Sequence, residues 1–391
     1  MGERFCFIAE TVSGFRCKAG KADGTPSASG IIQKSRLVPI FTALKKFARP
    51  PERDFLDRIV NKMRGSNVRS FLFFGVFIAL WFPAISLCCA DVPSLARYTY
   101  TEYHMGVDVR IVVYAPNKLT AERACTAAFK RFAELDTIMS DYRLDSELMR
   151  LCSKAGGAPV RVSRDLFTVL QYAQKVAKQS DGAFDVTCGP VIALWRQSRK
   201  THVLPLPEEI ALARTRVGWR KMRLDARKRT VRLLVSGMKL DLGGIGKGYA
   251  DDCAQKVLRH YGITCALVEA GGDIVVSNPP PHEKGWKIGV VNATTTPQTP
   301  LLFFANRAIS TSGDTEQFVE IGGLRYSHLV DPRTGEALTD RIQVTVIAPN
   351  GLTSDSLSKV VSVLGREKGE AIAHTYRKVS VFVRFRGTLN P

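Results

Sequence analysis

The segment 239–261, KLDLGGIGKGYADDCAQKVLRHY, constrains the fold more strongly than any other stretch of this chain. Apolar residues around Asp241 predict a short buried strand, and the glycines at 243, 244, 246 and 248 predict a tight turn. A helix is expected next, because apolar residues recur at the i, i+3, i+4 and i+7 spacing of one buried face, and Gly262 lies where the helix would end. That face comprises Ala250, Cys253, Ala254, Val257, Leu258 and Tyr261.

The glycine turn has two interpretations. It is either a plain tight turn or an anion site, since the first backbone N–H groups of a helix are unpaired and no Cβ hinders a phosphate there. Neither phosphate-binding fingerprint is met, because G-x-G-x-x-G lacks its third glycine and Lys247 is followed by Gly248 instead of Ser or Thr. A buried, unpaired carboxylate is costly, so Asp241 is expected to meet a metal ion, a ribose or a ring N–H.

Length and charge limit the classes of partner. The 391 residues carry a formal charge of +20, which favours anionic partners such as nucleotides, acidic proteins or phospholipid head groups. No stretch interleaves basic with aromatic residues, so nucleic acid is not a predicted partner. One large domain over 91–391, preceded by an N-terminal appendage, is expected.

Two N-terminal segments differ in character from the rest of the chain. Residues 1–62 are basic and lack hydrophobic periodicity, so we expect a disordered extension or a segment upstream of a true translation start at Met63. Residues 63–90 combine two arginines, an apolar run and small residues before Asp91, which is the pattern of a signal peptide or, if uncleaved, a membrane anchor. We therefore expect export to the periplasm or attachment to the outer side of the inner membrane.

Nine cysteines are present, and the five that follow the predicted signal are Cys125, Cys152, Cys188, Cys253 and Cys265. They form neither a CxxC motif nor a Cys/His cluster, so a structural zinc site is not expected. Two lie on the apolar faces of predicted helices. Most of the five are interpreted as small buried hydrophobic residues without disulfide bonds.

The remaining pattern predicts more strands than helices. Alternation over 100–115 predicts one strand, and apolar stripes predict helices over 124–139, 166–176 and about 354–364. Further strands are expected at 230–240, 263–268, 273–277, 286–291, 307–310, 317–321 and 343–348. Because the strands come in runs, we expect an α+β fold with a mixed, largely antiparallel sheet packed against helices, and not a doubly wound parallel sheet.

Two polar side chains, Asp355 and His328, are candidates for catalysis. Asp355 is expected in the first turn of the last helix, capped by Thr353 or Ser354, where the helix dipole stabilises an acid without any function. Lys359 follows at i+4 and can pair with it. His328 precedes a turn that can brace it, but histidine is also the side chain best suited to accept a proton near neutral pH.

Six stretches resemble the ApbE family of flavin transferases, the FAD:protein FMN transferases, and occur in the same order over roughly 104–380. They are MSDYRLDSEL (139–148), DGAFDVTCGPVIALW (181–195), LDLGGIGKGYADD (240–252), ALVEAGGDIVV (266–276), AISTSGDTEQF through YSHLVDPRTGEAL (308–338) and VTVIAPNGLTSDSLSKVVSVLG (344–365). The resemblance implies the T-fold-like α+β domain of that family.

The resemblance also implies roles for residues at matching positions, with His328 and Asp355 in catalysis. The implied flavin-binding residues are Met105, Tyr142, Ala183, Phe184, Asp185, Asp241, Lys247 and Leu329. The implied Mg²⁺ ligands are the carbonyl of Gly244, Asp355 and a hydroxyl at position 359, with Ser358 as a further oxygen. This chain has Lys359 instead, and an ammonium cannot ligate a metal. Either the ammonium replaces part of the metal's charge, or Mg²⁺ binds through Asp355, water and Gly244.

The function that the resemblance implies is a transferase that cleaves FAD, attaches FMN through a phosphodiester to a Thr or Ser of an acceptor protein, and releases AMP, with Mg²⁺ as cofactor. A membrane-associated redox protein is the expected acceptor, in keeping with the export signal. Phosphoryl transfer requires charge neutralisation and an in-line nucleophile, and a glycine turn with a cation suits the first of these. Two alternatives remain, a flavin-binding protein without transfer activity and an FAD pyrophosphatase that yields FMN and AMP.

Overall fold

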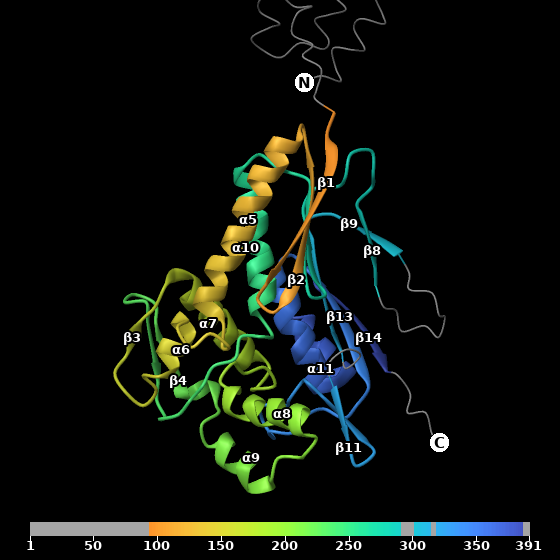
Figure 1. Ribbon diagram of the computed structural model, residues 1–391. Coiled ribbons are helices and arrows are strands. Elements are labelled where there is room, and N and C mark those ends of the chain that lie inside the picture. Colours follow the sequence, from red (N-terminus) through yellow and green to blue (C-terminus); the bar gives the residue numbers. More distant parts are fainter. Residues whose placement is uncertain (1–93, 291–300, 314–317, 386–391) are drawn as a thin grey trace, which may run out of the picture. The chain divides into compact units, whose positions relative to one another are not determined.

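The computed structural model describes residues 94–290, 301–313 and 318–385 (Figure 1). The chain divides into two units, 1–92 and 93–391, and all described residues belong to the second. The N-terminal segments predicted at 1–62 and 63–90 therefore lie outside the described residues. Within the described ranges, no helix is both long and apolar enough to cross a bilayer.

A seven-stranded sheet organises this unit, and each neighbouring pair in it is antiparallel. The strands lie in the order β1 (Ala96–His104), β2 (Val107–Ala115), β6 (Ala266–Ala270), β7 (Asp273–Val276), β10 (Arg307–Gly313), β13 (Ile342–Ala348) and β14 (Ser380–Phe385). The predictions at 263–268, 273–277, 307–310 and 343–348 fall on β6, β7, β10 and β13. Together with the helices, this sheet confirms the predicted α+β fold.

Helices cover one face of the sheet (Figure 1). The main ones are α5 (Lys118–Met139), α7 (Arg164–Gln179), α10 (Gly246–His260) and α11 (Gly351–Ala373), and each was expected from its apolar stripe. α10 packs against both α5 and α11 and against β6 and β7. On β2, Ile111 and Val113 join the core under the helices, whereas Val112 joins a second core on the opposite face. The alternation of a strand therefore makes both faces of the sheet hydrophobic here.

Smaller elements complete the unit. β8 (Trp286–Gly289) pairs with β9 (Leu301–Phe304), and β11 (Phe318–Ile321) pairs with β12 (Leu324–Ser327). A three-stranded sheet has the order β3 (Val160–Arg161), β5 (Thr230–Leu233) and β4 (Met222–Asp225). The short helices are α6 (Glu147–Cys152), α8 (Gly189–Thr201), α9 (Pro207–Arg214) and the 3-10 helix η3 (Trp219–Lys221). These helices and β3, β4, β9, β12 and β14 were not predicted, because short elements carry little periodicity.

The predicted end of α10 is confirmed. Gly262 has a φ of 82°, its N–H donates to the Arg259 carbonyl, and the N–H of Ile263 donates to the Leu258 carbonyl, both at 3.0 Å. These two bonds form a Schellman motif, whose left-handed residue favours glycine. Of the predicted buried face, Ala250, Cys253, Ala254 and Leu258 are buried, Val257 is half-buried against the core, and Tyr261, at the C-cap, is exposed.

The prediction of one strand over 100–115 is wrong, because the chain reverses within it. β1 and β2 form a hairpin in which His104 pairs with Val107, and Met105 and Gly106 form the turn with φ angles of 51° and 81°. Two successive residues with positive φ are typical of a two-residue type I′ loop. The alternation of side chains continues on both sides of so short a loop, so periodicity alone does not reveal it.

The segment around Asp241 is not a strand of a sheet, contrary to prediction. Its strand-like backbone contacts include an isolated bridge between Cys188 and Lys239 and a hydrogen bond of 2.8 Å from the Asp241 N–H to the Val186 carbonyl. Likewise, the strand predicted over 230–240 ends at Leu233. Apolar composition predicted burial here correctly, but a buried extended segment does not need strand neighbours on both sides.

The last helix begins earlier and ends later than predicted. Asn350 is its N-cap, and the Asn350 side chain accepts a hydrogen bond of 2.9 Å from the Thr353 N–H. Neither Thr353 nor Ser354 is therefore the cap, and Asp355 lies in the second turn, where the first-turn dipole argument no longer applies. The predicted end at 364 coincides with a kink at Gly365, whose φ is 75°, and helical structure continues beyond it.

Two pairs of hydroxyl groups join α11 to β10. Ser354 Oγ lies 2.8 Å from Ser310 Oγ, and Ser358 Oγ lies 2.8 Å from Ser312 Oγ. All four residues are buried. Because each hydroxyl both donates and accepts, such pairs satisfy buried polar groups without any charge.

All five cysteines that follow the predicted signal are buried and have free thiols, which confirms their interpretation as small hydrophobic residues. Burial, more than the neighbouring Asp241 and Asp185, raises the pKa of the Cys188 thiol well above its ordinary value. This thiol therefore stays protonated and packs as an apolar group.

Candidate active site

The glycine turn lies at the N-terminus of α10. The Asp241 carboxylate accepts a hydrogen bond of 2.8 Å from the Gly243 N–H, and the N–H groups of Ile245 and Gly246 donate to the Leu242 carbonyl at 3.0 and 2.7 Å. α10 then begins without a side-chain cap from its N-cap residue, Ile245. No side chain of the turn itself caps α10, but the Gly246 N–H is already engaged by Leu242, so an anion here would depend on nearby cations as well as on the helix start.

Packing requires glycine at two positions where α10 and α11 meet. A Cβ on Gly248 would lie 2.1 Å from the Gly351 carbonyl oxygen, and a Cβ on Gly351 would lie 2.2 Å from the Gly248 carbonyl oxygen. α10 and α11 therefore touch backbone to backbone. Gly244 is enclosed more loosely, because its Cβ would lie 3.3 Å from Lys359 Cγ and 3.4 Å from Phe184 Cε2.

Asp355 is fully buried where α10 and α11 meet. One carboxylate oxygen accepts a hydrogen bond of 3.1 Å from the Gly248 N–H, and the other lies 2.6 Å from Lys359 Nζ. Burial alone would raise the pKa of Asp355, but Lys359, Lys247 and these hydrogen bonds outweigh burial and lower the pKa below its ordinary value. Asp355 is thus an ionised carboxylate with both oxygens engaged, and the predicted i+4 pair with Lys359 is confirmed.

Lys247 places a second ammonium group beside the turn. Its Nζ lies 3.1 Å from Asp273 Oδ2 and donates to the Gly243 carbonyl at 3.3 Å. Burial lowers the pKa of Lys247, but Asp273 and Asp355 have the larger combined effect and raise it above its ordinary value. The side chains of Lys247 and Lys359 are 19% and 16% exposed, so a ligand at the turn can reach part of each.

Asp241 has its partner inside the protein. A guanidinium nitrogen of Arg196, on α8, lies 2.6 Å from the Asp241 carboxylate, and Arg196 also binds Asp141. Burial and Asp141 raise the pKa of Asp241, and Arg196 opposes them. The same guanidinium lies 4.6 Å from the centre of the Tyr142 ring. Sequence reasoning missed Arg196, although the available signal was the cation that directly follows the apolar segment 183–195.

Apolar side chains from two other segments meet the turn. Phe184 is buried beside Gly244, and its neighbour Ala183 is buried too. Met105, at the tip of the β1–β2 hairpin, approaches from the other segment, because its Cε lies 3.6 Å from the position that a Cβ on Gly246 would have. An aromatic ring and a thioether are therefore available to a flat ligand at the turn.

Asp185 forms its hydrogen bonds within its own loop. One carboxylate oxygen accepts from both the N–H and the hydroxyl of Thr187, at 2.8 and 2.7 Å. Burial raises the pKa of Asp185, and the bonds from Thr187 oppose this effect. The Thr187 hydroxyl in turn accepts a hydrogen bond of 2.8 Å from the Gly218 N–H. Asp185 therefore braces the loop that carries Phe184.

His328 and Leu329 directly follow β12. The Leu329 N–H donates to the Ser327 hydroxyl at 3.1 Å, and the Leu329 carbonyl accepts from the Leu338 N–H at 2.9 Å. Leu329 is buried and His328 is half-buried. The predicted turn over 331–335 closes this short loop, which presents His328 at its start.

α8 connects the two parts of the site. Trp195 donates from Nε1 to the Gly335 carbonyl at 2.9 Å, and the next residue, Arg196, binds Asp241. The contacts described above bring together Met105, Phe184, Gly244, Lys247, Asp355 and Lys359 around the glycine turn. His328 and Leu329 lie on the separate loop that α8 holds.

The donors around Asp355 do not fit a divalent cation. Lys359 holds the carboxylate oxygen that a metal ion would bind, and two like unit charges 4 Å apart repel by about 4 kcal/mol at an effective dielectric constant of about 20. Ser358 is also engaged, because its hydroxyl donates to the Asp355 carbonyl at 2.8 Å and pairs with Ser312. Among the residues that the structure describes, no group of three or more His, Cys, Asp or Glu side chains could hold a metal ion.

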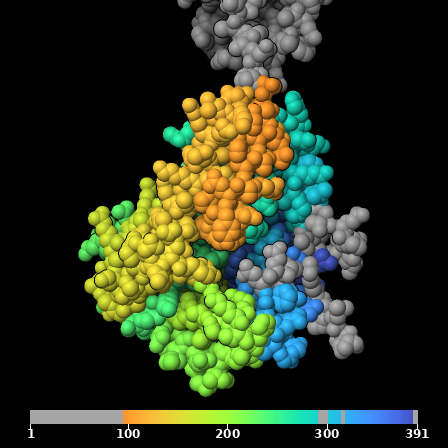
Figure 2. All heavy atoms as spheres, in the orientation of Figure 1, coloured from red at the N-terminus to blue at the C-terminus, as the bar shows by residue number. Residues whose placement is uncertain are grey.

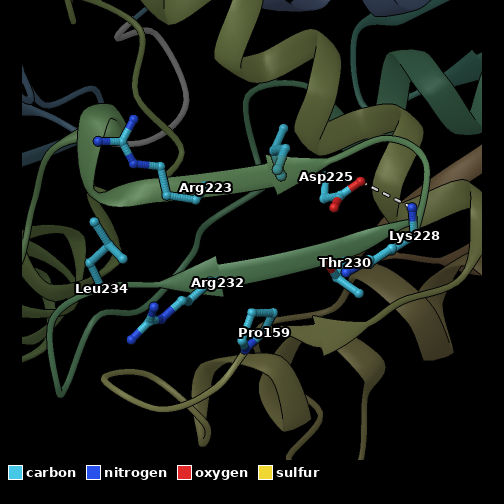
Figure 3. Close-up of a pocket in the computed structure, with 8 residues that line it drawn as sticks. Pro159, Arg223, Asp225, Lys228, Thr230, Arg232 and Leu234 are labelled. Carbon is cyan, nitrogen blue, oxygen red and sulfur yellow. Dashed lines mark hydrogen bonds between the residues drawn. The ribbon is translucent and has the colours of Figure 1, made fainter.

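A hollow lies beside the candidate site, and a separate cavity lies elsewhere on the surface. Figure 2 shows a hollow where the orange hairpin, the green segment around α8 and the blue segment that follows residue 318 meet, and these segments carry Met105, Arg196 and His328. A cavity of about 600 Å³ lies on the β3–β5–β4 sheet (Figure 3). Its lining includes Arg223, Asp225, Lys228 and Arg232 but no residue of the glycine turn, so it is not part of the candidate site.

Comparison with known proteins identifies the family. The ApbE family model matches residues 105–383. The FAD:protein FMN transferase of Treponema pallidum (strain Nichols) is 32% identical over 314 residues, which are 76% of this chain and 87% of that protein. The structure of the flavin transferase ApbE from Vibrio cholerae is 28% identical in sequence, with a TM-score of 0.67, and covers 73% of this chain and 93% of that chain. The apo structure of the flavinyl transferase ApbE from Pseudomonas stutzeri is 27% identical, with a TM-score of 0.68, and covers 76% of this chain and 93% of that chain. This chain belongs to the ApbE family.

Proposed function

We propose that this chain cleaves FAD, transfers FMN as a phosphodiester to a Thr or Ser hydroxyl of an acceptor protein, and releases AMP. The observation that carries the proposal is the convergence, in a member of the ApbE family, of a helix N-terminus without a local cap, two ammonium groups and a buried carboxylate at one glycine turn. The name of its relatives, FAD:protein FMN transferase, supports both a flavin dinucleotide and a protein as substrates.

The flavin and the phosphates would contact different residues. Met105, Phe184 and Leu329 provide apolar or aromatic surface for the ring system. Asp241 is the acceptor for a ring N–H or a ribose hydroxyl, and Lys247 is the cation for a phosphate. Ala183, Asp185 and Tyr142 complete the proposed binding residues, Asp185 by bracing its loop and Tyr142 through Arg196.

The transfer step needs little covalent help from the protein. The acceptor hydroxyl oxygen forms a bond to the FMN phosphorus, the bond from that phosphorus to the bridging oxygen breaks, and AMP leaves with the electron pair. Positive charge on the phosphate oxygens stabilises this transition state. The hydroxyl proton goes to His328, because Asp355 has a lowered pKa and two hydrogen bonds and is therefore a weak base.

Three further predictions rest on the sequence alone. Magnesium, with ligands at Gly244, Asp355, Ser358 and position 359, stays a prediction of the resemblance, and no step is derived through it because the donors do not fit it. Export, to the periplasm or to the outer side of the inner membrane, rests on residues 63–90. A membrane-associated redox protein is the acceptor that such a location favours.

One incubation distinguishes this function from its two alternatives. Purified protein is mixed with FAD and a candidate acceptor, and the products are separated under denaturing conditions. Flavin fluorescence that stays on the acceptor shows transfer, and an acceptor whose Thr or Ser is replaced by Ala is the control. Free FMN without labelled acceptor would show a pyrophosphatase, and unchanged FAD would show a protein that only binds flavin.

A further inference from the structure

Lys359 is held in a way that distinguishes it from an ordinary surface lysine. Its Nζ lies 2.6 Å from the fully buried Asp355 carboxylate, and its Cγ lies 3.3 Å from the position that a Cβ on Gly244 would have. The stem therefore lies along the glycine turn while the ammonium is fixed near the start of α10. A lysine on an exposed helix face would instead have many rotamers available and no fixed direction.

The pair with Asp355 orients the ammonium without using all of its donors. An ammonium has three N–H groups, and Asp355 accepts from it with one carboxylate oxygen. The second carboxylate oxygen accepts from the Gly248 N–H, so Asp355 presents no unbound oxygen to repel an anion. Because the Lys359 side chain is 16% exposed, its remaining N–H groups can reach a ligand at the turn.

A divalent ion and this ammonium compete for one place. Both require the same Asp355 oxygen, and Ser358, the nearest alternative hydroxyl, is committed to Ser312 and to the Asp355 carbonyl. The protein thus carries its own cation at the position where a metal ion would otherwise neutralise phosphate.

We infer that Lys359 supplies the positive charge that a metal ion would otherwise provide at this site, and that its ammonium, oriented by Asp355, donates hydrogen bonds to the pyrophosphate of FAD so that binding needs no divalent metal ion. The inference rests on the proposed function for the identity of its ligand. Inorganic pyrophosphate carries the same charged groups without the flavin, so it tests the cation independently of the transfer activity.

The test compares four proteins by calorimetric titration with inorganic pyrophosphate and with FAD, each in EDTA and in excess Mg²⁺. They are the full chain and its Lys359→Met, Lys359→Arg and Lys368→Met variants, and Lys368 is an exposed lysine on the same helix. The unchanged chain is expected to bind both ligands equally well in EDTA and in Mg²⁺. Lys359→Met is expected to weaken both in EDTA by about tenfold or more, the size of one charged hydrogen bond. Lys359→Arg is expected to recover most of this loss because it keeps a cation at the position, and Lys368→Met is the control that should leave both affinities unchanged.

Two results would overturn the inference. One is pyrophosphate affinity of the unchanged chain that collapses in EDTA, and the other is unchanged pyrophosphate affinity in Lys359→Met. Thermal unfolding of each variant shows whether it folds, and if Lys359→Met does not fold, the comparison of the unchanged chain in EDTA and Mg²⁺ still decides. Metal-independent pyrophosphate binding that depends on Lys359, without FMN on any acceptor, would refute the proposed function and leave the inference intact.

Discussion

Two helix N-termini meet in this molecule, and the protein completes them differently. At the start of α11, the Asn350 side chain accepts from the Thr353 N–H at 2.9 Å. Asp252, on α10, accepts from the Gly351 and Leu352 N–H groups at 2.8 and 3.1 Å. Three N–H groups of the first turn of α11 therefore have side-chain partners, and this N-terminus is closed by the protein itself.

The N–H groups at the start of α10 have fewer side-chain partners. Ile245 provides no side-chain cap, and Asp355, on α11, accepts only from the Gly248 N–H. Its other oxygen binds Lys359. Burial raises the pKa of Asp252, whereas the cations around Asp355 outweigh burial and lower its pKa. Each helix thus provides an aspartate that accepts hydrogen bonds from the first turn of the other helix. Asp252 only caps α11, whereas Asp355 also binds the Lys359 ammonium where a ligand can reach it.

Asp355→Ala should have the largest effect, because it removes the group that orients Lys359. FMN transfer per folded molecule is expected to fall by about 10²–10³-fold, the range for losing one preorganised electrostatic group, while FAD affinity falls less. Labelled acceptor and FAD titration measure the two quantities. Equal losses of transfer and affinity would show that Asp355 has a structural role only, and the proposed functional difference between Asp355 and Asp252 would be wrong.

Asp252→Ala is the matched change at the closed terminus. It leaves the N–H groups of Gly351 and Leu352 without their acceptor, at about 1–3 kcal/mol each, so the free energy of unfolding should fall by about 3 kcal/mol. Transfer per folded molecule should stay near that of the unchanged chain. Urea unfolding and labelled acceptor give the two numbers, and a loss of transfer as large as that of Asp355→Ala would show that both termini serve the ligand.

Gly248→Ala tests whether the two termini must touch. The new Cβ would lie 2.1 Å from the Gly351 carbonyl oxygen, so α10 and α11 must separate, and unfolding should become easier by about 1–3 kcal/mol, as in other overpacked cores. Gly246→Ala is the control on the same helix, because its Cβ would meet only Met105 Cε at 3.6 Å and Leu242 Cβ at 3.8 Å. Equal stability of the two variants would contradict the close contact.

Asp241→Asn changes only the glycine turn that precedes α10 and leaves the start of α11 unaltered. One carboxylate acceptor becomes an amide of nearly the same volume, so FAD affinity is expected to fall by about tenfold while the fold is kept. Fluorescence titration with FAD measures the affinity, and circular dichroism confirms the fold. Unchanged affinity would mean that Asp241 only pairs with Arg196.

The smallest effect should be a change in pH dependence at the closed terminus. The pKa of Asp252 is raised above 3.8, so the folded chain holds this proton more tightly than the unfolded chain does. The contribution of Asp252 to stability therefore falls as the pH rises from below 3.8 through the folded pKa. Asp252→Asn should make this decline shallower in urea unfolding at a series of pH values, and an unchanged slope would contradict the raised pKa. Asp355 has the opposite sign: its contribution is present above the ordinary pKa and is lost as the pH falls through the lowered one.

Local sequence patterns predicted much of the region around the N-terminus of α10, called the open terminus here because it has fewer side-chain caps than that of α11. The buried face of α10, its end at Gly262 and the pair between Asp355 and Lys359 each depend on residues within a few positions of one another, where periodicity and spacing carry information. Local patterns also misled. Thr353 or Ser354 was predicted as the cap because the helix was expected to begin only at about 354, whereas Asn350 is the N-cap. The β1–β2 turn was missed because its first residue is Met105, and methionine is not among the residues that mark a two-residue hairpin turn.

The rest of the site depends on contacts between distant segments. Arg196 and Asp241 are 45 residues apart, and Gly248 and Asp355 are 107 apart. The glycines of α10 and α11 touch only because the fold crosses these helices. No spacing rule states which helix start will meet which aspartate, so the closed and the open terminus could not be told apart from the sequence.

The hydroxyl pairs between α11 and β10 separate two kinds of sensitivity. Ser354 with Ser310 and Ser358 with Ser312 are uncharged, so their contacts do not change with dissolved salt. The ammonium groups beside the turn are partly exposed, and charges in such places are screened over about 10 Å at 0.1 M ionic strength. Added salt should therefore lower the affinity of the site for an anion while the packing of α11 against β10 stays the same. Ionic strength can thus change ligand binding without changing the structure that supports the site.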